Sequence, residues 1–273
     1  EEKNPYSFEI GAGFSDTDSL VCMVELSSNN FDITDPKNLF TGGGQRLRIR
    51  GMGGLDRNDV SIDFTEPWLL DMPLQLDISG YLNNVAYEYW DESRLGVRTS
   101  LSRKIFDDFT SVSAGYKFEN VHVYDVASKR SREMRDLQGW SNVSQVSASI
   151  TRDTRDNLLS PTSGYLVNLS TAGAFKPLGS SNNFYRLEGK GIYFFSFFDK
   201  FLICHVGGKL GTVADFNRSH AVPVYERYFL GGGDSVRGFE YRTISPVDNQ
   251  EKAIGGQSMA LATAEITHPI YKF

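Results

Sequence analysis

Residues 7–14 read Ser-Phe-Glu-Ile-Gly-Ala-Gly-Phe, and this stretch shows the pattern that decides the fold. Its apolar residues occupy every second position, and the positions between them hold small or polar residues. Successive side chains of a β-strand point to opposite faces, so a period of two predicts a strand with one apolar and one polar face.

The same alternation recurs along the whole chain of 273 residues, and it predicts about twelve strands in all. The further segments are 20–26, 46–50, 60–65, 74–79, 95–102, 112–119, 145–150, 165–170, 185–193, 202–210 and 259–266. Many can extend to the roughly 9–11 residues that a tilted strand needs to cross a bilayer. No segment has the 3.6-residue period of a helix and no boundary divides the chain, so we expect one all-β domain over residues 1–273.

Composition excludes some classes of protein. The net charge of −6 argues against a nucleic-acid-binding protein. The sequence contains no run of about 18 apolar residues, so it predicts no transmembrane helix. The mean hydropathy of −0.32 is that of a soluble protein, but a transmembrane β-barrel also averages near neutral because its faces alternate. The only cysteines, Cys22 and Cys204, are expected to be small buried hydrophobes.

The polar faces allow two arrangements, a soluble β-sandwich or a membrane barrel with a polar interior. Alternating connection lengths favour the barrel: residues 124–139 form a long charged loop, whereas 107–109 form a short turn. Aromatic residues also cluster at the strand ends, as in the girdles at membrane interfaces. These are Trp68, Tyr87, Tyr89, Trp90, Phe106, Phe109, Trp140, Phe194, Phe195, Phe197 and Phe198.

Residues 229–239 read Phe-Leu-Gly-Gly-Gly-Asp-Ser-Val-Arg-Gly-Phe, too rich in glycine for a strand interior. The apolar flanks and the single cation, Arg237, predict a loop buried in a polar cavity, where the arginine needs an acidic partner. The alternative is an exposed turn with a surface arginine. No Gly-Lys-Ser/Thr follows, which argues against a phosphate-binding loop. Gly233-Asp234-Ser235 has no supporting histidine pattern, so we expect no enzyme, metal or cofactor.

Three stretches together resemble the BamA family of bacterial outer-membrane assembly factors, part of the bacterial surface antigen superfamily. Residues 231–239 resemble the family's loop-six motif, Val-Arg-Gly-Phe/Tyr. Residues 151–157 with 160–164 resemble the strand and turn before the ninth strand. Residues 254–266 resemble the strand after loop six. The order and spacing of all three agree with the family.

The resemblance implies a transmembrane antiparallel β-barrel of about sixteen strands in the bacterial outer membrane, preceded by POTRA domains. About twelve strands are present here, so we expect a single barrel domain that is incomplete at its C-terminus, without POTRA domains in this chain.

The resemblance also implies two sets of site residues. The loop-six lock comprises Gly231, Gly232, Gly233, Asp234, Val236, Arg237, Gly238 and Phe239, with Glu265 on the inward face of the next strand as the partner of the arginine. The substrate gate is the first strand, with Tyr6, Phe8, Ile10, Gly11, Gly13 and Phe14. Glycines weaken strand pairing, although an ordinary wall strand can also contain them.

The implied function is insertion of β-barrel proteins through a lateral seam at the first strand. The implied partners are unfolded outer-membrane β-barrel substrates, accessory lipoproteins of an assembly complex and outer-membrane lipid. The alternative is a polypeptide translocation pore of the same superfamily, of the two-partner-secretion or TamA-like type.

Overall fold

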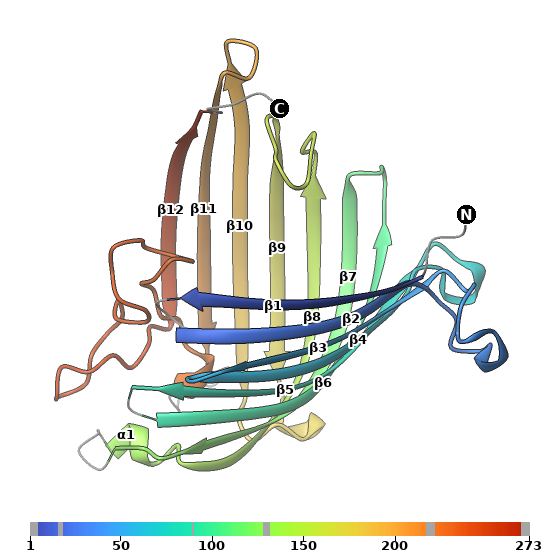
Figure 1. Cartoon of the computed structure of the whole chain (residues 1–273). Helices are drawn as coiled ribbons and strands as arrows, with labels where there is room; N and C mark the ends of the chain where they lie inside the picture. The colour runs from blue at the N-terminus through green and yellow to red at the C-terminus, as the bar shows by residue number, and fades with distance from the viewer. Residues whose placement is uncertain (1–4, 16–18, 89, 128–131, 217–221, 269–273) are drawn as a thin grey trace.

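The computed structural model describes residues 5–15, 19–88, 90–127, 132–216 and 222–268. They form one antiparallel sheet of twelve strands, each paired with its neighbours in the chain (Figure 1). The strands are β1 (Tyr6–Ser15), β2 (Ser19–Phe31), β3 (Gln45–Gly54), β4 (Arg57–Glu66), β5 (Gln75–Tyr87), β6 (Trp90–Lys104), β7 (Thr110–Tyr124), β8 (Gly139–Asp153), β9 (Gly164–Ala174), β10 (Phe184–Phe197), β11 (Leu202–Ala214) and β12 (Ser258–Thr267). Every predicted segment is a strand, so the predicted fold class is confirmed.

Helical structure in the described residues is limited to single turns. These are α1 (Arg132–Arg135), η1 (Pro36–Asn38), η2 (Leu69–Asp71), η3 (Lys176–Leu178) and η4 (Val224–Glu226). None of the described helices has the length and apolar character to cross a membrane.

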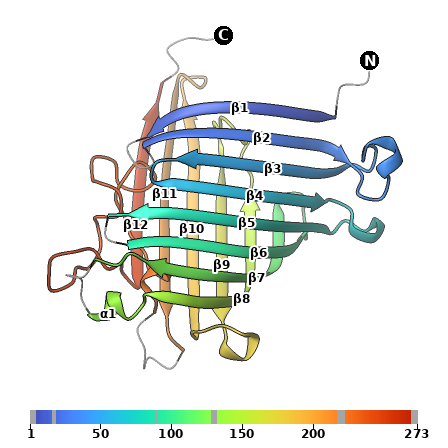
Figure 2. The ribbon, with the colours of Figure 1, turned by 60° about the horizontal axis from the view of Figure 1, so that its bottom comes forward.

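The sheet is strongly curved but not closed. β1 to β5 run across the view of Figure 1, whereas β8 to β12 stand upright, as the right-handed twist of strands accumulates along the sheet. Both views bring the end of β1 near β12 (Figures 1 and 2). Among the described residues, however, β1 pairs with β2 alone and β12 with β11 alone.

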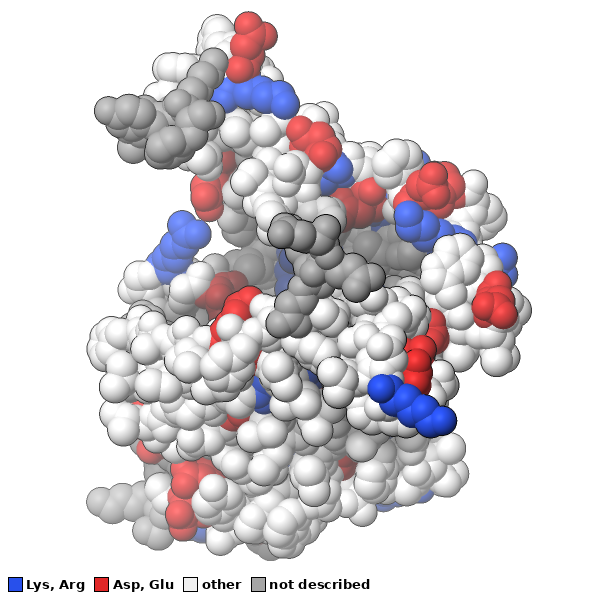
Figure 3. Space-filling model, turned by 45° about the vertical axis from the view of Figure 1, so that its right-hand side comes forward, with Lys and Arg blue, Asp and Glu red and all other residues white. Residues whose placement is uncertain are grey.

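The apolar face of the sheet points outward and is exposed. Large apolar side chains along it include Ile10, Leu95, Val97, Leu169 and Leu187. Figure 3 shows this character on one side of the molecule, where much of the lower half carries few charged side chains. Such a surface fits the lipid-facing band of a membrane barrel.

The buried core lies inside the curve of the sheet, at the end where residues 215–257 connect β11 to β12. We call this connection loop six. The buried apolar residues are Trp90, Val121, Val123, Val143, Ala174, Phe184 and Val213 from strands, Met134 from α1, and Val222, Val224, Tyr225 and Tyr228 from loop six. Loop six therefore contributes directly to the core.

Several local expectations are wrong. Connection lengths do not alternate throughout, because residues 32–44 at the end opposite loop six are longer than residues 55–56 at the loop-six end. Tyr87 and Trp90 pack into the core instead of joining an outer girdle, because loop six covers them. Tyr89 lies outside the described residues. Cys204 is buried, but Cys22 is exposed on the outer face.

The turn between β6 and β7, residues 105–109, is tied to β8 by an ion pair. Nη1 of Arg152 lies 2.6 Å from Oδ2 of Asp107. The hydrogen bond from this guanidinium lowers the pKa of the Asp107 carboxyl to about 2.

Candidate functional site in loop six

Loop six has a ladder of its own. Isolated bridges pair Tyr228 with Gly256 and Leu230 with Ile244. The Tyr228 amide donates to the Gly256 carbonyl at 2.9 Å, and the Gly256 amide donates to the Tyr228 carbonyl at 2.7 Å. The outgoing and returning arms of the loop are therefore joined by backbone hydrogen bonds, and the tip, residues 231–239, lies between them.

The turn at the tip of loop six requires the first glycine of the run, Gly231. Gly231 has φ +108, and a Cβ there would lie 2.2 Å from the backbone oxygen of Glu240. The amide of Gly231 also donates to Oγ of Ser235 at 2.8 Å. A Cβ on Gly233 would meet nothing within 4 Å. The conformation thus requires glycine at Gly231, whereas Gly233 leaves room for a side chain.

Arg237 reaches the strand that follows the loop. Its Nη2 lies 3.6 Å from Oε2 of Glu265, but the side chains are 79% and 40% exposed. The two residues are brought together, whereas the expected burial of Arg237 is not found. The reason is the open sheet, because no described strand lies beyond β12 to cover the pair.

The other residues of the predicted lock share the tip. Gly232 is buried with Gly231, whereas Asp234, Gly238 and Phe239 are exposed and Val236 is partly covered. Phe239 is 57% exposed, so the expected apolar burial is not found at this end of the motif.

The predicted gate residues all lie on β1. Phe8, Ile10 and Phe14 project from the exposed apolar face, with 64%, 72% and 82% of their surface accessible. Gly11 and Gly13 stand opposite Met23 and Val21 of β2. The hydroxyl of Tyr6 donates to the carbonyl of Leu39, which ties the start of β1 to the connection between β2 and β3.

A buried carboxylate attaches the start of loop six to the wall. Glu226, in η4, is 5% exposed. Nη2 of Arg186 on β10 lies 2.7 Å from its Oε2, and Nη1 of Arg94 on β6 lies 3.8 Å from its Oε1. Arg94 also donates to the carbonyl of Tyr225 at 2.9 Å. We call Glu226 with Arg94 and Arg186 the Glu226 anchor.

Further charges balance the two arginines of the anchor. Nη1 of Arg94 lies 3.3 Å from Oε1 of Glu119, and Nη1 of Arg186 lies 3.4 Å from Oε1 of Glu188. Glu119 in turn accepts a hydrogen bond from Lys117 at 2.8 Å. Because each buried ion has a partner of opposite charge, the network fixes the position of loop six without leaving an unpaired charge.

Two tyrosines of loop six are held neutral beside the anchor. Burial raises the pKa of Tyr225 to about 12, and burial also raises the pKa of Tyr228. The Tyr228 hydroxyl donates to Oε1 of Glu188 at 2.9 Å. Both phenols therefore remain protonated, and Tyr228 acts as a hydrogen-bond donor to the wall.

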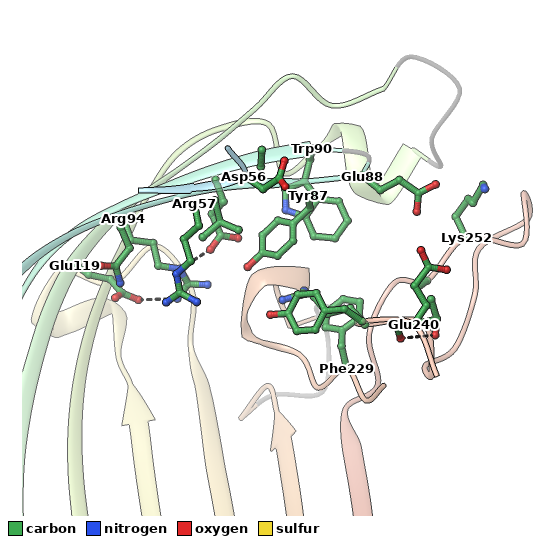
Figure 4. Close-up of a pocket in the computed structure, with 18 of the residues that line it drawn as sticks. Asp56, Arg57, Tyr87, Glu88, Trp90, Arg94, Glu119, Phe229, Glu240 and Lys252 are labelled. Atoms are coloured by element: carbon green, nitrogen blue, oxygen red, sulfur yellow. Dashed lines mark hydrogen bonds and ion pairs between the residues drawn. The ribbon is translucent and has the colours of Figure 1, made fainter. Parts of the chain in front are cut away.

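A cavity of about 960 Å³ separates the middle of loop six from the inner face of β4 to β7 (Figure 4). Its lining carries both signs of charge and includes Arg57, Arg94, Lys117, Glu119, Glu240 and Lys252. In the same view Arg94 and Glu119 point from the wall toward the loop. The interior is therefore polar, as the alternating sequence predicts.

Sequence reasoning missed Glu226 and its role. The alternation over residues 185–193 puts Arg186 on the polar face of its strand, but it does not identify a partner for the guanidinium. The signal for Glu226 was its setting, since residues 222–225 read Val-Pro-Val-Tyr and a carboxylate after such a run needs a buried partner. Identifying that partner requires the fold, because β10 and loop six are far apart in the chain.

Comparison with known proteins gives one family. Residues 38–273 match the model of the Omp85 superfamily domain. "Outer membrane protein assembly factor BamA" of Nitratidesulfovibrio vulgaris is 27% identical over 84% of this chain and 29% of its own length. BamA of Neisseria meningitidis serogroup B is 24% identical over 98% of this chain and 35% of its own length. The chain thus spans about a third of the length of these curated relatives.

Solved structures agree on the fold. The crystal structure of BamA from Haemophilus ducreyi lacking POTRA domains 1–3 matches with a TM-score of 0.82 at 20% identity, over 100% of this chain and 55% of that one. CdiB from Escherichia coli matches with a TM-score of 0.62 at 16% identity, over 100% of this chain and 50% of that one.

Proposed function

The chain belongs to the Omp85 superfamily, and from this premise we propose that it is the barrel part of an outer-membrane protein assembly factor. The predicted location in the bacterial outer membrane is confirmed by the family and by the relatives. The observation that carries the proposal is similarity to BamA proteins over 84% and 98% of the chain. The names of these relatives state a role in the assembly of outer-membrane proteins, and we propose the same role for this chain.

The proposed gate is the free edge of β1. This strand pairs with β2 along Tyr6–Ser15, and within the described residues its other edge has no strand partner. An unpaired edge offers backbone donors and acceptors to an incoming strand by β-augmentation. The proposed substrates are unfolded outer-membrane β-barrel proteins, with accessory lipoproteins and membrane lipid as further partners. The proposed mechanism requires no covalent catalysis.

The proposed role of the loop-six tip is a lock between the loop and β12. Its support is the ion pair of Arg237 with Glu265 at 3.6 Å. An Arg–carboxylate pair has directional geometry, and shielding from water would strengthen it.

A complementation assay tests the lock. The variant Arg237→Ala of the full-length protein is expected to fold but to give poor growth and low levels of outer-membrane β-barrel proteins. The matched control is Glu240→Gln, which changes an exposed charge beside the motif, outside the lock residues. The swap of Arg237→Glu with Glu265→Arg is expected to restore part of the function. Normal growth and normal protein levels in Arg237→Ala would refute the lock.

Photo-crosslinking tests the gate separately. A photoreactive residue at Phe8 is expected to capture unfolded β-barrel substrates, whereas one at Leu95 is not, because β6 is paired on both sides. A cysteine pair joining β1 to the last strand of the full-length protein is expected to block assembly. Equal capture at both positions would argue against the gate. Capture of a single secreted polypeptide would favour the translocation pore.

A further inference from the structure

The returning arm of loop six carries a second arginine, Arg242, in contact with three aromatic rings. The guanidinium carbon lies 3.7 Å from the ring centre of Phe229, 4.4 Å from that of Tyr87 and 5.6 Å from that of Trp90. All three distances are within the roughly 6 Å over which a cation is attracted to an aromatic face. We call these three rings the aromatic cage.

The cage joins the wall to the loop. Tyr87 of β5 and Trp90 of β6 are cross-strand partners with ring centres 5.0 Å apart, and Phe229 belongs to the outgoing arm of loop six. In Figure 4 Tyr87 and Trp90 extend from the wall above Phe229. Trp90 is 6% exposed, and Tyr87 and Phe229 are partly buried against the same core. A guanidinium between these rings links both arms of the loop to two wall strands.

The contacts of Arg242 are with rings and not with carboxylates. Across the described residues, no ion pair involves Arg242, and its Nε has no hydrogen-bond partner. Its backbone has φ +61, a left-handed conformation that is unfavourable for a residue other than glycine. Such a conformation persists where side-chain contacts stabilise it. A planar guanidinium also stacks on aromatic faces better than an ammonium.

We propose that Arg242 is a positioning residue, which fastens the returning arm of loop six to β5 and β6 by stacking in the aromatic cage. This attachment is separate from the Glu226 anchor, which holds the start of the loop to β6 and β10. The tip with Arg237 lies between the two attachments. The inference concerns how the loop is held and does not depend on the assembly function.

Hydrogen–deuterium exchange of the purified full-length protein in detergent micelles tests the proposal. The reporters are the amides of Leu230 and Ile244, which bond to each other's carbonyls across the loop ladder. Arg242→Met keeps the length of the side chain and removes its charge. We expect exchange of both amides to become about 2- to 30-fold faster, equivalent to about 0.5–2 kcal/mol at about 1.4 kcal/mol per tenfold. Arg242→Lys should give a smaller increase.

A double-mutant cycle separates stacking from a general loss of structure. Tyr87→Leu is expected to accelerate the same amides, whereas Tyr87→Phe, which keeps the ring, should leave them protected. The combination of Arg242→Met with Tyr87→Leu should accelerate exchange by less than the two single effects added together, because both variants remove the contact between Arg242 and Tyr87. Arg237→Met serves as a control that removes another loop-six cation, the one at the tip of the loop.

The result that would overturn the proposal is unchanged exchange of Leu230 and Ile244 in Arg242→Met while amides of β9 and β10 stay protected. Effects of Arg242→Met and Tyr87→Leu that add fully would also overturn it, because additive effects mean that the two side chains act independently.

Discussion

Replacing Glu226 with Gln should loosen loop six more than any other isosteric change of a loop-six carboxylate. The amide keeps the volume of the side chain and can still accept one hydrogen bond from Arg186, but the charge is lost. Glu226 is 5% exposed, so its contact with the 2.7 Å partner is shielded from water. The wall arginines would then face a neutral group at the base of the loop.

The size of the stability loss depends on which ion pairs Arg94 and Arg186 keep in the variant. Removing one partner of a buried ion pair costs about 3–5 kcal/mol when the other ion is left alone. Here Arg186 keeps Glu188 at 3.4 Å, and Arg94 keeps Glu119 at 3.3 Å. Both arginine side chains are also 22% exposed, so water compensates in part. We therefore expect the free energy of unfolding to fall by about 2 kcal/mol, which is less than the cost of leaving a buried ion without a partner.

Urea unfolding of the full-length protein in detergent micelles measures this loss. The matched control is Glu240→Gln, an exposed carboxylate of the same loop, which should change the free energy of unfolding by less than about 0.5 kcal/mol. If the two variants were equally stable, the burial and short distances of Glu226 would not stabilise the loop, and the Glu226 anchor would be refuted.

Three further changes have defined outcomes. Gly231→Ala should lower the free energy of unfolding by at least about 1 kcal/mol, because φ is +108 and the new Cβ meets a backbone oxygen; Gly233→Ala should not, and equal losses would contradict the turn geometry. Asp107→Asn should be destabilising above about pH 4 and neutral near pH 2. The pKa of this carboxyl is depressed to about 2 in the folded state, so its stabilising effect is lost as pH falls through that range; a deficit independent of pH in urea titrations would count against the pair. Leu169→Arg, on the outer face, should cost about 2–4 kcal/mol in lipid vesicles if the residue lies near the bilayer midplane, whereas Ser170→Arg beside Glu188 should be tolerated; similar costs would exclude a lipid-facing outer surface.

The strands could be predicted from the sequence, but their ends at loop six could not. The pattern predicts a strand over 112–119, whereas β7 continues to Tyr124. Beyond Glu119 the inward positions are Val121 and Val123, which are 0% and 3% exposed in the core under loop six. The inner face is apolar there, so the apolar residues move from the even to the odd positions and the alternation no longer continues in one phase. The start of β8 is missed for the same reason, since Val143 is buried inward.

The candidate site was predictable only in part. The sequence indicates Arg237 and, through the family motif, its neighbour Glu265. It does not indicate how exposed that pair is, because exposure depends on which strands stand beside β12. Nor does it indicate the contacts of Glu226 or Arg242, since their partners on β5, β6 and β10 approach only when the sheet curves. The alternation along each strand indicates which face of the sheet a side chain is on. It does not indicate which loop packs against that side chain.

The Glu226 anchor has a mechanical consequence. In the part of the chain that the structure describes, each strand pairs only with its sequence neighbours, so the sheet resists bending weakly between successive pairs. Glu226 connects β6 directly to β10 across the interior, and it acts as a cross-brace at one end. We expect that end to keep its radius while the opposite rim spreads and narrows more easily, because the ion pairs described there, such as Arg152 with Asp107, join nearby elements and do not cross the interior. The strands would then move apart least at the end near loop six, and the largest displacements would occur at the turns farthest from loop six.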